Sequence, residues 1–334
     1  MSKDCKAKEI GGYFEFEQFY GQEYHSRGLS LNCGRNALVF LIKGFGIKKI
    51  ALPYYLCDSV TDVCEKYNVS VRYYHINDRL IPVDNESCPE EYFYLVNYYG
   101  QIKEEYISEL YKKYGDKLII DNTQNFFAIP NLDVNTIYTC RKYFGVSDGA
   151  YLFPSKNKND KISKEYENLP VDKSLMKMKH LLGRFESGAE EFYLEYTKNE
   201  NSFADASIKK MSKITKNLLK GIDYERIKRK RTENFNYLHY WLSKYNELNI
   251  QSIEGPFMYP LLLNRGNELR KKLIAKKIFC PMLWPEVCDK CPKNTIEYNL
   301  THNLILLPID QRYGKSEMEY VVKIINEVES LGIS

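Results

Sequence analysis

Short apolar segments rich in β-branched and aromatic residues recur through the first half of the chain. Segments of this length and composition are typical of buried β-strands. They predict strands at residues 49–54, 69–76, 92–98, 117–121, 136–140 and 150–153. Apolar residues with helical spacing lie between several of these strands and predict helices at 37–43, 59–67 and 104–114.

The second half of the chain has a different pattern. Residues 156–164 are polar and predict a surface loop, whereas residues 172–248 contain little Gly or Pro and have a strongly helical pattern. Within that region, residues 223–242 predict one long amphipathic helix. The chain then returns to mixed elements, with predicted strands and helices at 259–263, 267–276, 303–307 and 316–331.

Strands that alternate with helices indicate an α/β fold with a mainly parallel sheet, and the C-terminal elements indicate a smaller α+β unit. We therefore expect a large domain at 1–220 and a small domain at 221–334. In parallel sheets, ligands bind at the carboxyl ends of the strands. Candidate site residues are therefore those that directly follow a strand.

Charge and apolar content argue against several classes of protein. The 334 residues include 48 Lys+Arg and 44 Asp+Glu, a net charge of +4, and no long basic block suggests nucleic acid as a ligand. The basic run at 228–231 is flanked by Glu225 and Glu233, so we interpret it as the solvated face of a helix. No apolar stretch approaches the roughly 18 residues of a membrane span, and the N-terminus does not resemble a signal peptide. Neither a membrane partner nor export is expected.

The nine cysteines are an odd number scattered along the chain, which indicates free thiols in a reducing cytoplasm. Cys288 and Cys291 have the spacing of half a zinc site, with Cys280 nearby and His302 as a fourth candidate ligand. A second pair is missing locally, so we favour plain thiols in a loop and expect no metal. The 29 tyrosines are a surplus. We interpret most of them as strand residues that bury a ring and keep the hydroxyl hydrated.

Two polar segments in the first half carry candidate chemistry. Asn32 is a candidate N-cap for the helix that follows, and Gly34 lets the N–H groups at the start of that helix approach a phosphate. An ordinary capped helix is the alternative. Asp121 ends an apolar strand, where an acid caps a helix, binds a cation or holds a protonated ring nitrogen.

Two basic residues follow later strands. Lys142 follows the strand at 136–140 and precedes a glycine-containing turn. Most lysines face solvent, whereas a desolvated lysine near other cations becomes a Schiff-base nucleophile. Arg312 follows the strand at 303–307, where it could clamp an anionic substrate or lie in a surface turn.

The order and spacing of these residues resemble the fold type I pyridoxal-phosphate (PLP) enzymes, and more narrowly the DegT/DnrJ/StrS family of sugar aminotransferases. The resemblance extends from Gly11 to Val328. It is carried by six motifs in family order, namely Gly34-Arg35-Asn36-Ala37-Leu38, Pro53-Tyr54-Tyr55, Asn97-Tyr98-Tyr99-Gly100, Asp121 to Gln124, Lys142 with Asp148 and Gly149, and Leu307-Pro308.

The resemblance implies the fold type I PLP-transferase architecture, a homodimer and a role for each matching residue. Lys142 would bind PLP covalently and carry the proton that moves during the reaction. Asp121 would pair with the ring nitrogen, Gln124 would hydrogen-bond near the phenolic oxygen, and Tyr55 would cover a face of the ring. The phosphate would bind the first amides of the helix and one hydroxyl, those of Gly34, Arg35, Asn36 and Thr139.

The implied reaction moves an amino group from glutamate onto a keto sugar linked to a nucleotide, with Tyr99 and Arg312 as candidate substrate contacts. Arg35 and Asn36 depart from the Thr or Ser usual in the family, and Cys57 occupies the position of a ring-stacking aromatic. A PLP enzyme acting on a small phosphorylated ketone or amino acid, or a non-catalytic PLP-binding relative, therefore remains an alternative. A branch that dehydrates its substrate carries histidine in place of the lysine, and Lys142 argues against it.

Overall fold

The computed structural model describes residues 10–83, 88 and 90–329. The strands are β1 (Leu29–Leu31), β2 (Lys49–Pro53), β3 (Ser70–Tyr74), β4 (Tyr92–Val96), β5 (Leu118–Asp121), β6 (Asn135–Thr139), β7 (Ala150–Phe153), β8 (Tyr259–Leu262) and β9 (Leu304–Leu307). The helices are α1 (Gly34–Phe45), α2 (Asp58–Lys66), α3 (Glu104–Tyr114), α4 (Asn159–Glu167), α5 (Lys179–Glu186), α6 (Tyr193–Asn201), α7 (Lys213–Lys220), α8 (Tyr224–Leu242), α9 (Gly266–Ala275), α10 (Val287–Lys290), α11 (Ile296–Asn303) and α12 (Lys315–Glu329).

Seven strands form one sheet in the order β1-β7-β6-β5-β4-β2-β3. The pairs from β3 through β2, β4 and β5 to β6 are parallel, whereas β7 runs antiparallel to both β6 and β1. Every residue of β4, β5 and β7 is buried, as expected for strands covered on both faces. The predicted α/β fold with a mainly parallel sheet is confirmed.

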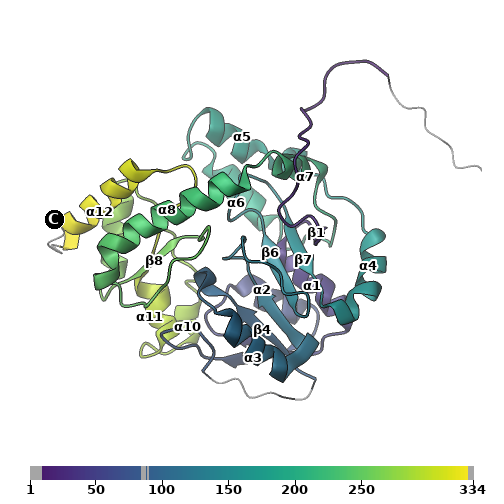
Figure 1. Cartoon of the computed structure of the whole chain (residues 1–334), viewed down its shortest axis with the longest axis horizontal. Helices are drawn as coiled ribbons and strands as arrows, with labels where there is room; N and C mark the ends of the chain where they lie inside the picture. Colours follow the sequence, from purple (N-terminus) through teal and green to yellow (C-terminus); the bar gives the residue numbers. More distant parts are fainter. Residues whose placement is uncertain (1–9, 84–87, 89, 330–334) are drawn as a thin grey trace, which may run out of the picture.

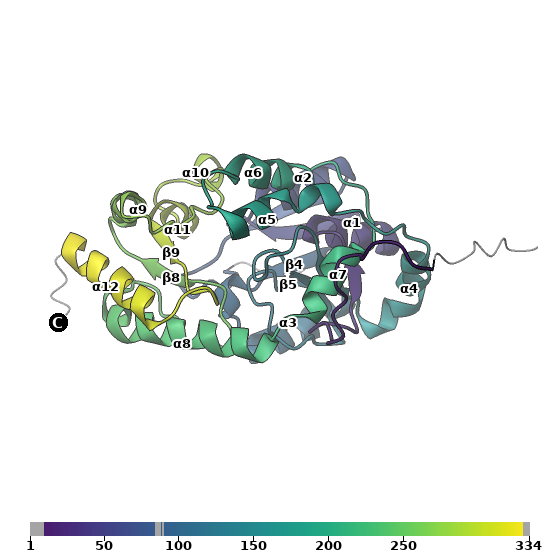
Figure 2. The same ribbon diagram turned by 90° about the horizontal axis from the view of Figure 1, so that it is seen from above.

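Helices cover both faces of this sheet. In Figure 2, α1 and α2 lie on one face of the strands and α3 lies on the other. The helix α1 packs against β6 and β7, while α3 packs against β5. No helix within the described part of the chain is long and apolar enough to cross a membrane.

The C-terminal elements build a second, smaller layer. Strands β8 and β9 form an antiparallel pair, and α8 packs against both β8 and α12. In Figure 1 these green-to-yellow elements lie together on the left, and the large sheet lies on the right. The predicted smaller α+β unit is therefore present.

The predicted strands and the long C-terminal helices are found, but two regions differ. Residues 156–164, predicted as a surface loop, instead contain a 3₁₀ turn and most of α4. The buried Ile162 explains the difference, because it packs against Gly44 of α1, where an added Cβ would lie 2.9 Å from the Ile162 side chain. Residues 172–248 are not one continuous helical region either, since loops separate α5, α6, α7 and α8.

His25, which precedes β1 in the chain, is buried in a cage of aromatic rings. Its ring lies 4.0 Å from Tyr138 and 4.8 Å from Phe126, measured between ring centroids, with Tyr151 and Phe153 within 5.6 Å. The Nε2 atom lies 2.7 Å from the carbonyl oxygen of Phe126. Burial lowers the pKa of His25 to about 4.

This lowered pKa makes the protein acid-sensitive. Between pH 6.5 and 4 the unfolded chain binds a proton at His25 that the folded protein excludes, so the free energy of unfolding falls with pH by up to about 3 kcal/mol from this group. The variant His25→Phe removes the titration and should flatten the stability curve over that window, as measured by urea unfolding at pH 7, 5 and 4. Parallel curves for the two proteins below pH 6.5 would contradict this expectation.

Candidate active site

The site lies where the parallel strands end. Because β4, β5 and β6 run in the same direction, their carboxyl ends meet at one edge of the sheet. Asp121 is the last residue of β5, and Thr139 is the last residue of β6. Lys142 follows Thr139 by three residues, and α1 begins beside these loops at Gly34.

Lys142 is held at this edge by two contacts. Its Nζ atom donates a hydrogen bond to Thr123 Oγ1 over 3.2 Å and lies 5.5 Å from the centroid of the Phe257 ring. The side chain remains open to solvent on one side. The protein that surrounds it on the others lowers its pKa below the ordinary lysine value, while the negative charge of Asp121 opposes the shift. The amine is therefore both reachable and easier to deprotonate than an ordinary lysine.

Asp121 has a fixed carboxylate. It is 6% exposed, and each of its oxygens accepts one hydrogen bond. The Tyr94 hydroxyl donates to Oδ2 over 2.9 Å, and the Thr123 backbone N–H donates to Oδ1 over 2.8 Å. Burial, together with the adjacent Asp121 charge, raises the pKa of Tyr94 well above its ordinary value, so its hydroxyl stays a donor.

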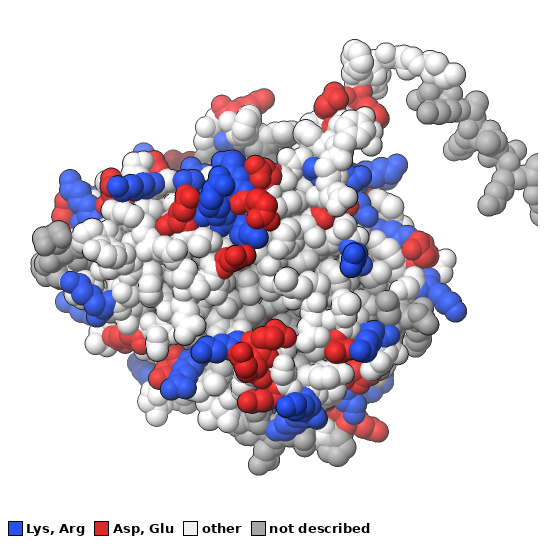
Figure 3. Space-filling view, in the orientation of Figure 1, with Lys and Arg blue, Asp and Glu red and all other residues white. Residues whose placement is uncertain are grey.

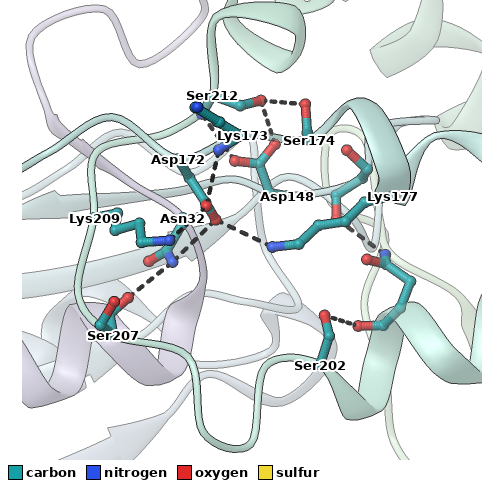
Figure 4. A network of polar contacts seen from close by, with 12 residues as sticks. Asn32, Asp148, Asp172, Lys173, Ser174, Lys177, Ser202, Ser207, Lys209 and Ser212 are labelled. Atoms are coloured by element: carbon teal, nitrogen blue, oxygen red, sulfur yellow. Dashed lines mark hydrogen bonds and ion pairs between the residues drawn. The ribbon is translucent and has the colours of Figure 1, made fainter.

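The helix α1 begins with N–H groups that no side chain caps. Its N-cap residue is Cys33, in an extended conformation and without a side-chain cap, so the predicted cap at Asn32 is wrong. The Asn32 amide instead donates to Asp172 Oδ2 and to the Ser207 carbonyl, and Asn36 donates to Asn32 Oδ1 and the same carbonyl. Figure 4 shows Asn32, Asp172 and Ser207 in this network. The Asn36 side chain is therefore structural, and its backbone N–H faces the Cys33 thiol, which it would have to leave to bind a ligand.

Gly34 is in close contact with Thr139. A Cβ atom added at Gly34 would lie 2.8 Å from Thr139 Cγ2 and 4.0 Å from Thr123 Cγ2. The Thr139 hydroxyl oxygen is buried and has no hydrogen-bond partner among the described residues. A buried polar atom without a partner costs free energy unless a ligand or water satisfies it. The hydroxyl and the start of α1 thus form a small polar cradle.

Gln124 offers a second unsatisfied donor. Its Oε1 atom accepts a hydrogen bond from the Tyr99 backbone N–H over 3.0 Å, which fixes the orientation of the amide. Its Nε2 atom is buried and has no partner within the described residues. Tyr99 has a left-handed backbone, with φ of 53°, and its hydroxyl lies 3.4 Å from that of Tyr55.

The two tyrosines belong to an aromatic cluster beside the site. Tyr55 is buried, and its ring centroid lies 5.3 Å from that of Tyr98 and 4.6 Å from that of Trp284. Through Gln124 and Tyr99, this cluster is hydrogen-bonded to the loop that follows Asp121. Tyr55 and Tyr99 thus lie next to the predicted site. The Tyr55 ring packs against Tyr98 and Trp284.

Positive charge surrounds the start of α1. Burial raises the pKa of the Cys33 thiol, and the charges of Arg141, Arg35 and Lys177 oppose that shift, which places all three cations near the first turn. Arg141 forms an ion pair with Glu200 and lies 4.2 Å from the centroid of the Phe203 ring. Because Arg141 pairs with Glu200 and Lys177 with Asp172, the suitability of the cradle for an anion depends on Arg35 and the helix amides.

Arg312 is not a free anion clamp in this structure. Its Nε and Nη2 atoms donate to both oxygens of Asp310 over 2.7 and 2.8 Å. The neighbouring Gln311 connects this C-terminal segment to the Lys142 loop. Its Nε2 atom donates to the carbonyl of Tyr143, the residue after Lys142, over 2.8 Å.

The basic run at 228–231 divides into two parts. Lys228 pairs with Glu225 and Glu254, and basic and acidic side chains are interspersed over the face shown in Figure 3. Arg231 is 2% exposed, so the interpretation of the whole run as a solvated face is wrong for this residue.

Sequence reasoning missed three residues of the site: Thr123, Tyr94 and Phe257. Thr123 lies inside the Asp121–Gln124 motif, so its position was a usable signal. Tyr94 lies in β4, where every residue is buried, so its contact with Asp121 does not stand out from the strand pattern. Phe257 approaches Lys142 from a loop far along the chain. The sequence gives no local sign of either contact. Within the described residues, no group of three or more His, Cys, Asp or Glu side chains could hold a metal ion.

No family model matches the chain, and no curated protein matches it in sequence. Solved structures do match. DesV of S. venezuelae superimposes with a TM-score of 0.64 at 13% identity, over 93% of this chain and 90% of that one. The sugar aminotransferase CalS13 of Micromonospora echinospora gives 0.63 at 11%, over 90% and 87%. A DegT DnrJ EryC1 StrS aminotransferase of Brucella abortus gives 0.63 at 11%, over 90% and 85%.

The chain has the fold of these aminotransferases. The likeness extends over nearly the whole of each chain, so the sheet and the small C-terminal layer belong to one shared architecture. At 11–13% identity, the aminotransferase fold alone is established by it. The activity of the site depends on its own residues.

Proposed function

We propose that this chain is a PLP-dependent aminotransferase that moves an amino group from glutamate onto a keto sugar. One observation carries the proposal: at the carboxyl edge of an aminotransferase fold, Lys142 and Asp121 lie beside two buried donors, Gln124 Nε2 and Thr139 Oγ1, that have no partner in the part of the chain that the structure describes. A cofactor with a ring oxygen and a phosphate would satisfy both donors.

The residues present fit PLP. The uncapped start of α1, with the amides of Gly34, Arg35 and Asn36, suits the phosphate together with the Thr139 hydroxyl. Asp121 suits a protonated ring nitrogen, and Gln124 Nε2 suits the ring hydroxyl. Tyr55, in the aromatic cluster beside the site, remains the residue proposed to cover a face of the ring. When bound, PLP supplies an aldehyde carbon that takes up the amino group and a ring that accepts electrons.

The chain's own residues then do the rest of the chemistry. Lys142 carries a proton between carbon centres, a task suited to an amine whose pKa is lowered by the protein around it. Thr123 holds Nζ on one side, and its backbone N–H holds Asp121. Tyr94 fixes the other oxygen of Asp121 and so keeps the carboxylate aimed in one direction.

We propose that the acceptor is a sugar linked to a nucleotide and that Tyr99 and Arg312 contact it. Arg312 would have to exchange Asp310 for an anionic substrate group, since the two are paired in the structure. The interspersed charge on the face in Figure 3 supports a small-molecule substrate rather than nucleic acid.

We further propose a homodimer in the cytoplasm. Several large apolar side chains on and around α5 and α6 are solvent-exposed, among them Phe185 at 92% and Met176 at 88%, and such surfaces mark interaction sites. The eight described cysteines are free, which supports a reducing compartment. Residues 1–220 would form the cofactor-binding domain and residues 221–334 the domain that completes the site.

The proposal is tested by titrating the purified protein with PLP and following the visible absorption of the lysine adduct. The band should appear, disappear on addition of glutamate, and return on addition of a keto-sugar nucleotide. Thermal-shift measurements with a panel of nucleotide sugars would identify the acceptor, because a ligand that binds the folded state raises the melting temperature. A protein that forms no band with PLP would refute the proposal that the chain is a PLP-dependent enzyme. A band that no amino donor removes would favour the non-catalytic alternative.

Gly34 provides a direct test of the phosphate cradle. In Gly34→Ala, the new Cβ would lie 2.8 Å from Thr139 Cγ2, so either the threonine or the first turn of α1 must shift. We expect the Kd for PLP to rise about tenfold, which corresponds to about 1.4 kcal/mol. Without cofactor, the variant should have the same melting temperature as the wild type, because alanine has a higher helix propensity than glycine.

The matched control is the double variant Gly34→Ala with Thr139→Ser, which keeps the hydroxyl and removes the clashing methyl group. Its Kd should return toward the wild-type value. An unchanged Kd in the single variant would show that this contact does not shape the PLP site.

A further inference from the structure

Arg231 of α8 is buried, its hydrogen bonds go to neutral oxygens, and the charge of Asp310 offsets the burial of its guanidinium only in part. Its Nε atom donates to Gln311 Oε1 over 2.9 Å, and Nη1 donates to the carbonyls of Pro256 and Phe257 over 3.1 and 3.0 Å. Nη2 donates to the Tyr143 carbonyl over 3.3 Å. Burial lowers the pKa of Arg231, yet a guanidinium remains charged in proteins. Burying this charge costs free energy, and a role as part of a solvated helix face does not explain its position.

The oxygens that Arg231 binds flank Lys142. The Tyr143 carbonyl belongs to the residue that follows Lys142, and it also accepts a hydrogen bond from Gln311. Phe257, whose carbonyl Arg231 holds, places its ring against the Lys142 amine. One guanidinium thus fixes both the backbone next to Lys142 and the ring that packs on its Nζ.

Further contacts keep these segments in place. The guanidinium carbon of Arg231 lies 4.5 Å from the centroid of the Tyr143 ring, which itself packs against Phe257 at 5.8 Å. The hydroxyl of Thr232, next to Arg231 on α8, accepts a hydrogen bond from the Gly255 N–H over 2.9 Å. The loop that carries Phe257 is therefore attached to α8 at two points.

We propose that Arg231 is a positioning residue for Lys142: by binding the carbonyls of Tyr143 and Phe257, it holds the Lys142 amine toward Thr123 and Asp121. The inference rests on the proposed function for its catalytic meaning. It also connects α8, which belongs to the C-terminal elements, with the lysine at the edge of the large sheet. A fork of five donors suits this task, since three separate segments are held by one rigid group.

The test uses the variant Arg231→Lys, which keeps the charge but loses the fork, and Arg231→Met, which loses both. Asn234→Ala is the matched control. Asn234 is one turn further along α8 and is also buried. It donates to the carbonyls of Ile309 and Tyr313, and not to those of Tyr143 or Phe257. Where Arg231→Met does not fold, Gln311→Leu replaces it, because it removes the second donor to the Tyr143 carbonyl.

The first readout is the reactivity of Lys142 without cofactor. Competitive labelling of amines from pH 7 to 10.5, read by peptide mass spectrometry, gives the apparent pKa of Lys142. Without Arg231, the Tyr143 backbone and the Phe257 ring are no longer held against Lys142, and its amine should be better solvated. The pKa of Lys142 should therefore rise toward the ordinary value of about 10.4 in both Arg231 variants. Asn234→Ala should lower the melting temperature and leave this pKa unchanged. A rise in Arg231→Lys excludes a simple effect of lost charge.

The second readout is the glutamate half-reaction of the PLP-loaded protein. Its kcat should fall about tenfold or more in Arg231→Lys, with KM for glutamate close to wild type, because a misdirected amine slows proton transfer. A wild-type protein that does not react with PLP and glutamate refutes the proposed function, while the labelling result still stands. Wild-type labelling and kcat in Arg231→Lys, or an equal shift in Asn234→Ala, would overturn the positioning role.

Discussion

Replacing Lys142 by alanine is expected to abolish the visible band of the PLP-loaded protein and to lower the rate of amino transfer by about a thousandfold or more, which is about 4 kcal/mol. The Lys142 amine donates to Thr123 and has Asp121 as the main opposing charge on its pKa. Alanine at position 142 leaves neither a covalent link nor a proton carrier there. Absorbance titration with PLP and single-turnover assays with glutamate measure the two effects.

The matched control is Lys177→Ala. Lys177 also lies near the start of α1, but its Nζ pairs with Asp172 over 3.1 Å and lies 4.6 Å from the Phe203 ring centroid. This variant should lose stability and retain the visible band. Trapping with borohydride followed by peptide mass spectrometry should find the cofactor on Lys142 in the wild type. An adduct on another lysine would contradict the assignment.

The position of the site could be predicted because it depends on strand direction. Apolar β-branched runs predicted the strands that end near Asp121 and Thr139, and parallel strands bring their carboxyl ends to one edge. Asp121, Gln124 and Lys142 all lie at or directly after the ends of these strands, so the shared edge brings them together. Local pattern and sheet geometry point in the same direction here.

The contacts that orient the site could not be predicted, because they join distant segments. Arg231 lies in a run of basic residues whose local pattern indicates a solvated helix face. Contacts with the Lys142 loop, with residues 256–257 and with Gln311 bury it. Arg312 follows a strand as expected, but Asp310, two residues earlier, takes up its charge. The helix start at Cys33 was missed for the same reason, since Asn32 bonds to Asp172, 140 residues away.

The expected effect of Asp121→Asn is a loss of rate with the fold retained. Asparagine keeps the shape and an oxygen that accepts a hydrogen bond from Tyr94 or Thr123, but it removes the negative charge. A carboxylate beside a ring nitrogen raises the pKa of that nitrogen by roughly 1–3 units, and without it the ring accepts electrons poorly. We expect kcat for the glutamate half-reaction to fall about a hundredfold or more, about 2.7 kcal/mol, with a smaller change in the Kd for PLP.

Asp148→Asn is the control for this variant. Asp148 is also buried near the Lys142 loop, but its oxygens accept hydrogen bonds from the Ser212 N–H and from the hydroxyls of Ser212 and Thr215 at the start of α7. Because these contacts are structural, the variant should lower the melting temperature and leave the turnover of the folded fraction near wild type.

A cofactor analogue separates the charge of Asp121 from its other contacts. N-methylated PLP carries a permanent positive charge on the ring nitrogen, so it has no need of a carboxylate to keep that charge. Loaded into Asp121→Asn, it should restore much of the lost rate of the glutamate half-reaction, whereas it should give Lys142→Ala no activity. If the analogue leaves Asp121→Asn as slow as PLP does, Asp121 acts through the position of Thr123 and Lys142, and its proposed role at the ring nitrogen is wrong.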